Sequence, residues 1–169
     1  MAALSERTLV LGVGNVLLAD EGAGVHAVHW LEEHYLFPAN VRLLDGGTQG
    51  LLLMGELLDA DRLIVIDAVR GGRAPGSVYR LEREGLRRCL GFSDSLHQLD
   101  LLDALNLQAM AGADIPEIAV FGLEPASLDH LSPALGAACR AALPKLCRMV
   151  INELRACGCT VTEKRADQV

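Results

Sequence analysis

The sequence is poor in aromatic residues and has no long hydrophobic run. Phe, Trp and Tyr together make up 4% of its 169 residues, so a hydrophobic core must be built mostly from Leu, Val, Ile and Ala. No apolar stretch approaches the roughly 20 residues of a membrane-spanning helix, and the residues before Thr8 are too few and too polar for a secretory signal. We therefore expect a cytoplasmic protein that has no membrane partner.

Positive charge and cysteine are also scarce. Lys and Arg number 15 against 22 Asp and Glu, which gives a net charge of -7. Because general nucleic-acid binding requires a positive surface, we expect no nucleic-acid partner. The five cysteines are odd in number and fit no zinc framework, which is typical of reduced cytoplasmic thiols. Cys157 and Cys159 are close enough to share a soft metal, but exposed thiols near a frayed chain end are the simpler interpretation.

The glycine-rich motifs of common nucleotide-binding folds are absent or incomplete. Neither the P-loop pattern G-x-x-x-x-G-K-[ST] nor the nucleophile pattern G-x-S-x-G is present. Gly12 and Gly14 match the first half of G-x-G-x-x-G, but Leu17 stands where that fingerprint needs a third glycine for close packing of helix on strand. Asp45, an acid that follows the second predicted strand, is the one feature that fits the dinucleotide-binding fingerprint. We therefore expect no nucleotide cofactor, and a Rossmann-like oxidoreductase is the less favoured alternative.

Strand and helix patterns alternate along the chain. Short apolar runs predict four strands, at 9–13, 41–44, 63–66 and 118–123, and the first of them is expected to be covered on both faces. Residues 77–81 predict an edge strand of uncertain direction. Helical spacing and capping signals, with Ser132-Pro133 as a start, predict four main helices at 22–36, 50–58, 96–110 and 132–157. This order favours an α/β fold with a mostly parallel sheet covered on both faces. We expect one domain over residues 1–169, with its core at about 8–157 and a polar tail at 160–169.

Acidic residues follow the predicted strands. The stretch from Leu9 to Val25 indicates a buried strand, a glycine-bearing turn and a helix start that carries Asp20 and Glu21. The second strand leads into Asp45-Gly46-Gly47, and the third ends at Asp67. Because the carboxyl ends of parallel strands meet at one rim of a sheet, where ligands bind in open α/β folds, we expect these acids to gather there.

An imidazole completes a candidate metal site. His97 lies in a turn at the start of a predicted helix, from which it can face the same rim. Carboxylate oxygens from Glu21 and Asp67 and one nitrogen from His97 suit a borderline divalent metal such as zinc or nickel, with positions left open for water or substrate. Asp45, beside two glycines, can approach a bound peptide closely.

Each of these residues also has a purely structural interpretation. Asp20 can cap the helix that follows it, and Glu21 in a first helical turn is explained by the helix dipole. Asp67 can simply close a strand, and His97 can be a surface residue. A second set, His26, His29 and Glu33, falls on one helical face, but it lies opposite the apolar stripe and is better explained as a solvated polar face.

Five segments resemble the motifs of the nickel–iron hydrogenase maturation proteases, in the same order. They are GVGNVLLADEGAGV at 12–25, DGGTQG at 45–50, IDA at 66–68, SLHQL at 95–99 and GLEPASL at 122–128. The resemblance covers about residues 8–157. The opening motif and the histidine segment together make it specific.

The resemblance implies a three-layer α/β/α sandwich of the phosphorylase/hydrolase-like kind, with about five strands in a mostly parallel twisted sheet. It implies an endopeptidase, classed with aspartic-type peptidases, that removes a C-terminal extension from the [NiFe]-hydrogenase large-subunit precursor after nickel insertion. Carried over by position, Glu21, Asp67 and His97 contact the metal, and Asp45 serves substrate recognition or catalysis. We expect nickel to arrive with the precursor and the protease to be a monomer. A non-catalytic nickel-sensing chaperone is the alternative.

Overall fold

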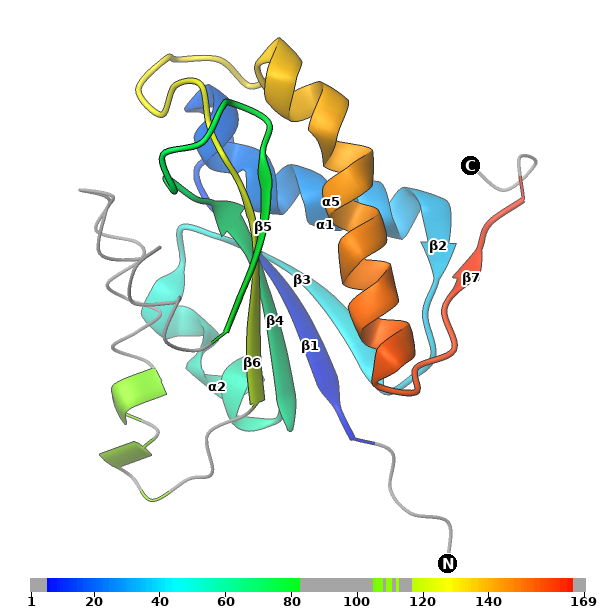
Figure 1. The fold of residues 1–169 in the computed structure, drawn as a ribbon. Coiled ribbons are helices and arrows are strands. Elements are labelled where there is room, and N and C mark those ends of the chain that lie inside the picture. The colour runs from blue at the N-terminus through cyan, green and yellow to red at the C-terminus, as the bar shows by residue number, and fades with distance from the viewer. Residues whose placement is uncertain (1–5, 83–104, 108, 111, 113–116, 166–169) are drawn as a thin grey trace, which may run out of the picture.

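The computed structural model describes residues 6–82, 105–107, 109–110, 112 and 117–165. A five-stranded sheet in the order β3-β1-β4-β6-β5 forms its centre (Figure 1). The strands are β1 (Thr8–Val13), β3 (Val41–Gly47), β4 (Arg62–Ala68), β5 (Val78–Glu82) and β6 (Glu117–Leu123). The first four strands in this spatial order pair in parallel, and β5 closes one edge antiparallel to β6. The predicted mostly parallel sheet is confirmed.

Helices lie on both faces of the sheet, which makes three layers (Figure 1). Helices α1 (Ala23–His34) and α5 (Ala137–Ala156) cover one face, where Val10, Ile64 and Phe121 enter their core. The other face is covered by the short 3-10 helix η2 (Gly50–Leu53) and by α2 (Met54–Leu58). Strand residues with the opposite parity, such as Leu9 and Leu63, pack on that side. This alternation follows from the two-residue period of a strand, and the predicted α/β/α sandwich is confirmed.

The strand order has a reversal at β1. The chain passes from β1 through α1 to β3 on one side of β1, and then from β3 through α2 to β4 on the other side. In open α/β sheets, ligands bind beyond the carboxyl ends of the strands at such a switch point. The rim formed by the carboxyl ends of β1 and β4, together with the neighbouring end of β3, is therefore the place to look for a site. We call it the rim below.

The last main helix begins later than the sequence predicts. Its first residue is Ala137, not Ser132. Instead of capping a helix, the Ser132 hydroxyl bonds to the backbone of Ala134, while the Ser132 amide donates to the Leu17 carbonyl at 3.0 Å. Ser132 and Pro133, which predicted a helix start, therefore lie in a loop that packs on the segment after β1.

The predicted polar tail is wrong for its first residues. Strand β7 (Thr162–Glu163) pairs antiparallel with β2 (Tyr35–Leu36). Val161 and Cys159 are buried against the α1 and α5 side of the core, so the expectation of an exposed Cys159 is also wrong. A two-residue strand pair between distant segments has too little pattern to be recognised from sequence.

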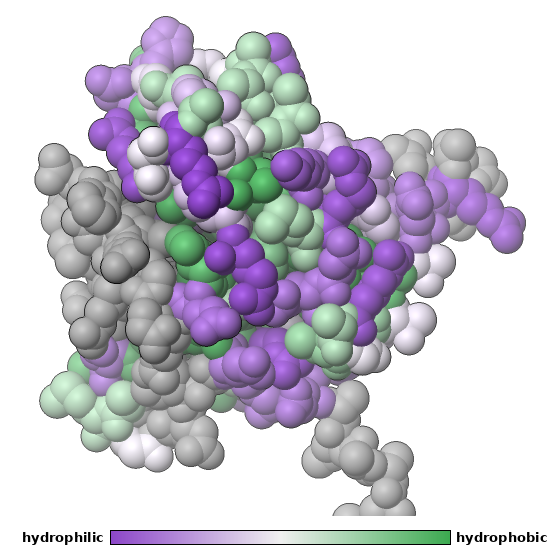
Figure 2. All heavy atoms as spheres, in the orientation of Figure 1, coloured by the Kyte–Doolittle hydropathy of each residue, from purple (hydrophilic) through white to green (hydrophobic). Residues whose placement is uncertain are grey.

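Polar and charged residues cover most of the coloured surface in Figure 2, and hydrophobic residues show between them in small areas. None of the helices in the described part of the chain combines the length and apolar character needed to cross a bilayer.

Candidate active site

Glycines bring the start of α1 into direct contact with the strand ends. A Cβ atom on Gly24 would lie 2.0 Å from the Ile66 carbonyl oxygen and 2.4 Å from the Val13 carbonyl oxygen. A Cβ on Gly14, whose φ is +128°, would lie 1.8 Å from the carbonyl oxygen of Glu21. Side chains at these positions would collide with backbone, so the glycines permit the packing. They hold the 3-10 helix η1 (Ala19–Gly22), which contains Glu21, against the ends of β1 and β4.

Two buried carboxylates lie at this rim. Glu21 is 8% exposed in η1, and Asp67 is 1% exposed near the end of β4. The Oδ1 atom of Asp67 accepts a hydrogen bond from the Ala68 amide at 2.7 Å. Because Gly24 touches Ile66, the residue before Asp67, the structure brings both acids to the same end of the sheet. Burying carboxylates costs free energy that a bound cation can offset, so this placement favours a cationic ligand.

Asp45 lies at the same end of the sheet but is open to solvent. It is next to Gly12 in the register of β3 on β1, and its side chain is 44% exposed. One carboxylate oxygen accepts the Gly47 amide at 3.0 Å, and the other lies 3.1 Å from Nε2 of His29 on α1. Asp45 is therefore held in place without being buried, which leaves it able to exchange a proton with water or substrate.

The polar face of α1 carries two histidines, His26 and His29, whose surroundings differ. His26 is half-buried, and burial together with the nearby His29 lowers its pKa. His29 points instead to Asp45. The predicted solvated polar face is confirmed for His29 and Glu33, which are exposed, but not for His26, which is half-buried. The contact between His29 and Asp45 was not predicted, because nothing in the sequence shows how α1 is placed relative to β3.

The third predicted metal ligand, His97, lies outside the described residues. Within the described part of the chain, no group of three or more His, Cys, Asp or Glu is arranged to hold a metal ion. The rim donors that the structure describes are the oxygens of Glu21 and Asp67. Such a donor set accepts hard or borderline divalent cations, and an added imidazole would favour nickel or zinc.

Asp20 does not cap a helix, contrary to the sequence-based interpretation. It is 1% exposed inside η1, and α1 begins after Gly22 without a side-chain cap. Its carboxylate accepts backbone amides from Ala126, Ser127 and Gly136, at 2.8, 3.4 and 2.7 Å. These partners are more than 100 residues away in the chain, so local sequence could not reveal them.

A further buried carboxylate, that of Glu124, secures the loop between β4 and β5. It accepts hydrogen bonds from the Tyr79 hydroxyl and from the amides of Gly71 and Arg73, the latter two at 2.8 and 3.3 Å. Burial alone would raise the pKa of Glu124, but these hydrogen bonds outweigh it and hold the pKa below its usual value. The glutamate of the GLEPASL segment is thus a structural carboxylate.

The lowered pKa of Glu124 predicts a specific pH dependence. At pH 7, Glu124→Gln is expected to reduce the free energy of unfolding by about 1 to 3 kcal/mol, because charged hydrogen bonds are lost. The stabilisation by Glu124 is complete above its unfolded pKa, near 4.5, and is lost as the pH falls through the lower folded pKa. The difference between the two proteins should therefore shrink in acid, as measured by urea unfolding at several pH values. Glu163→Gln, on exposed β7, is the control; a pH-independent difference for Glu124→Gln would contradict this account.

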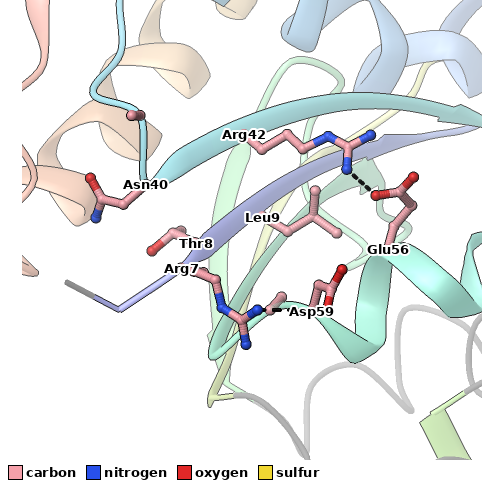
Figure 3. Close-up of a pocket in the computed structure, with 9 residues that line it drawn as sticks. Arg7, Thr8, Leu9, Asn40, Arg42, Glu56 and Asp59 are labelled. Atoms are coloured by element: carbon pink, nitrogen blue, oxygen red, sulfur yellow. Dashed lines mark hydrogen bonds and ion pairs between the residues drawn. The ribbon is translucent and has the colours of Figure 1, made fainter. Parts of the chain in front are cut away.

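A pocket of about 210 Å³ lies at the end of the sheet opposite the rim, beside the start of β1 (Figure 3). Its lining residues are Arg7, Thr8, Leu9, Ala39, Asn40, Arg42, Glu56, Asp59 and Ala60. Arg42 pairs with Glu56, and Arg7 lies 3.5 Å from Asp59 (Figure 3). Because both arginines are already paired with acids and the pocket is remote from the rim, we assign it no part in the chemistry.

The family follows from comparison with known proteins. Residues 25–153, more than half of the chain, match the family model described as hydrogenase maturation protease. This chain belongs to the hydrogenase maturation proteases. Hydrogenase expression/formation protein HupM of Azotobacter chroococcum mcd 1 is 40% identical over 168 residues, which are 99% of this chain and 80% of that protein. The hydrogenase 2 maturation protease of Escherichia coli K12 is 37% identical over 164 residues, 95% of this chain and 98% of that one.

Solved structures of hydrogenase maturation proteases share the fold. The hydrogenase maturating endopeptidase HybD from E. coli aligns with a TM-score of 0.87 at 35% identity, over 94% of this chain and 98% of that one. A [NiFe] hydrogenase maturation protease HybD from Thermococcus kodakarensis aligns with a TM-score of 0.71 at 26% identity, over 87% of this chain and 98% of that one. The chain is therefore a hydrogenase maturation endopeptidase, and the resemblance seen in its sequence motifs is confirmed.

Proposed function

We propose that this protease removes a C-terminal extension from the large-subunit precursor of a [NiFe] hydrogenase once nickel has been inserted. Membership of the family supports the protease activity, and the name of its T. kodakarensis relative supports the class of hydrogenase. The observation that carries the proposal is the pair of buried carboxylates, Glu21 and Asp67, at the switch point of the sheet. A cation carried by the substrate would offset the cost of burying them.

In this proposal, Glu21, Asp67 and His97 contact the nickel of the docked precursor. Nickel bound in the precursor supplies polarisation of the scissile carbonyl or of a water molecule. The two buried carboxylates attract the cation strongly because they lie in a medium of low dielectric constant. Asp45, solvent-accessible and oriented by Gly47 and His29, accepts a proton from the attacking water as general base. Because a carboxylate acts as the general base, we propose that the enzyme is an aspartic-type peptidase.

We further propose that the protease acts in the cytoplasm as a monomer. Among the described cysteines, Cys139, Cys147, Cys157 and Cys159 are free thiols, which fits a reducing compartment. The large-subunit precursor is then the partner, with no role for nucleic acid or membrane.

Comparison of nickel-loaded and nickel-free precursor tests the proposed function. We expect the purified protease to shorten the nickel-loaded precursor, seen as a shift on a denaturing gel and as a changed C-terminal mass, and to leave the nickel-free precursor intact. Mature large subunit, which lacks the extension, is the control substrate. Equal cleavage of both precursors would disprove nickel as the checkpoint. Cleavage of neither, with the protease bound to the loaded precursor, would favour the chaperone alternative.

A further inference from the structure

The buried Asp20 is bonded on both carboxylate oxygens to one distant loop. Oδ1 accepts the Gly136 amide at 2.7 Å, and Oδ2 accepts the amides of Ala126 and Ser127 at 2.8 and 3.4 Å. We call residues 126–136 the anchor loop. A Cβ atom on Gly136 would lie 3.1 Å from Oδ1 of Asp20, so glycine allows this close approach. With both oxygens already engaged by backbone amides, Asp20 is poorly suited to ligate a metal.

Backbone contacts extend this attachment along the segment before Asp20. The Ala19 amide donates to the Ser132 carbonyl at 2.8 Å, and the Ser132 amide donates to the Leu17 carbonyl at 3.0 Å. Ala19 has a φ of +47°, a left-handed conformation that costs a residue with a side chain about 1 to 2 kcal/mol. The anchor loop therefore holds this turn in a conformation that it would not favour alone.

Asp20 connects the two parts of the rim that carry Glu21 and Asp67. Glu21 directly follows Asp20 in η1. The anchor loop continues from β6, the strand that pairs with β4, and Gly122 of β6 lies beside Asp67 in the register. The carboxylate of Asp20 thus links η1 to the anchor loop, which follows β6, the strand next to β4. Loss of this link would free η1 to shift relative to Asp67.

We propose that Asp20 is a positioning residue, which ties the anchor loop to η1 and thereby fixes Glu21 relative to Asp67. The inference rests on the proposed function, because it assigns Glu21 to the reacting site. Asp20 itself does not touch the substrate. Its removal should lower the turnover of correctly folded protein, because a shift of about 1 Å in a catalytic group can cost about 100-fold in rate.

The test measures kcat and KM for the nickel-loaded precursor in Asp20→Asn and Gly136→Ala, with the folded fraction determined by circular dichroism. Asp20→Asn replaces one acceptor oxygen by an NH₂ group that faces amide donors, and we expect kcat per folded molecule to fall by about 100-fold with little change in KM. Gly136→Ala, which keeps the charge and presses on the carboxylate, should lower kcat by less. Asp129→Asn is the control, because this exposed aspartate of the same loop bonds to Ser127 and not to η1.

A purely structural role would lower the folded fraction and leave kcat per folded molecule unchanged, and that result would overturn the inference. If Asp20→Asn does not fold, Gly136→Ala decides in the same way. Glu21→Ala separates this inference from the proposed function. An inactive Glu21→Ala beside fully active Asp20 and Gly136 variants contradicts the inference alone, whereas an active Glu21→Ala contradicts the assignment of Glu21 to the site.

Discussion

Replacing Glu21 by Gln or Asp67 by Asn is expected to reduce kcat/KM for the nickel-loaded precursor by about 100- to 1000-fold, the range found when one preorganised electrostatic contact is removed from an active site. The amides keep the volume and polarity of these buried side chains but remove the negative charge that the cation requires. In Asp67→Asn, the carbonyl oxygen of the new side chain can still accept the Ala68 amide, so the end of β4 should keep its shape. Precursor processing is measured by gel shift and C-terminal mass.

The matched control for these variants is Asp59→Asn. The side chain of Asp59 is 82% exposed, and it pairs with Arg7 at the end of the sheet opposite the rim. Its replacement removes the same unit of charge from the protein and should leave processing unchanged. Full processing by either rim variant, with its circular dichroism spectrum unchanged, would remove that residue from the site.

Gly24→Ala is expected to destabilise the fold by about 3 kcal/mol or more, at the upper end of overpacking effects. The new Cβ would lie 2.0 Å from the Ile66 carbonyl oxygen and 2.4 Å from the Val13 carbonyl oxygen. Both contacts are with backbone, so α1 must move away from the sheet. Because η1 and Glu21 precede α1 directly, the same shift should also lower processing. Urea unfolding gives the change in stability.

Gly55→Ala is the control for this substitution. The Cβ of an alanine at Gly55, in α2, would meet no atom within 4 Å in the described structure. Alanine there should stabilise the protein by about 0.5 to 1 kcal/mol, since glycine is a poor helix residue. If Gly24→Ala were as stable as the unchanged protein, the close packing of α1 on the ends of β1 and β4 would be wrong.

The central sheet could be predicted from sequence because each of its buried strands is a continuous apolar run. Leu63 to Ile66, for example, carries large apolar side chains to both faces, which is a sufficient signal for a strand between two helical layers. The placement of Asp45 and Asp67 at one end of the sheet followed from parallel strand order. Glu21 joins them because Gly14 and Gly24 allow η1 and the start of α1 to pack on the strand ends. The role of His97 stays a prediction, because the residue lies outside the described structure.

Contacts between distant segments could not be predicted. Asp20 has the sequence context of a helix cap, yet its partners are the amides of Ala126, Ser127 and Gly136. Ser132 likewise has a strong local signal for a helix start, and docking on Leu17 overrides it. In both cases a short polar side chain satisfies backbone amides in a loop rather than at a helix end, and tertiary packing selects between the two.

The direction of α1 has a practical consequence for handling the enzyme. Its first residues lie at the rim, and its last residues lead into β2, where β7 pairs and the Lys164 amide bonds to the His34 carbonyl. A helix of 12 residues is about 18 Å long, so β7 at the far end of α1 lies well away from η1 (Figure 1). Glu6 and Arg7 directly precede Thr8, the first residue of β1, and so lie at the end of that strand opposite the rim. Affinity tags or fluorophores attached at β7 or just before β1 would therefore lie at a distance from the rim, where the precursor is proposed to dock.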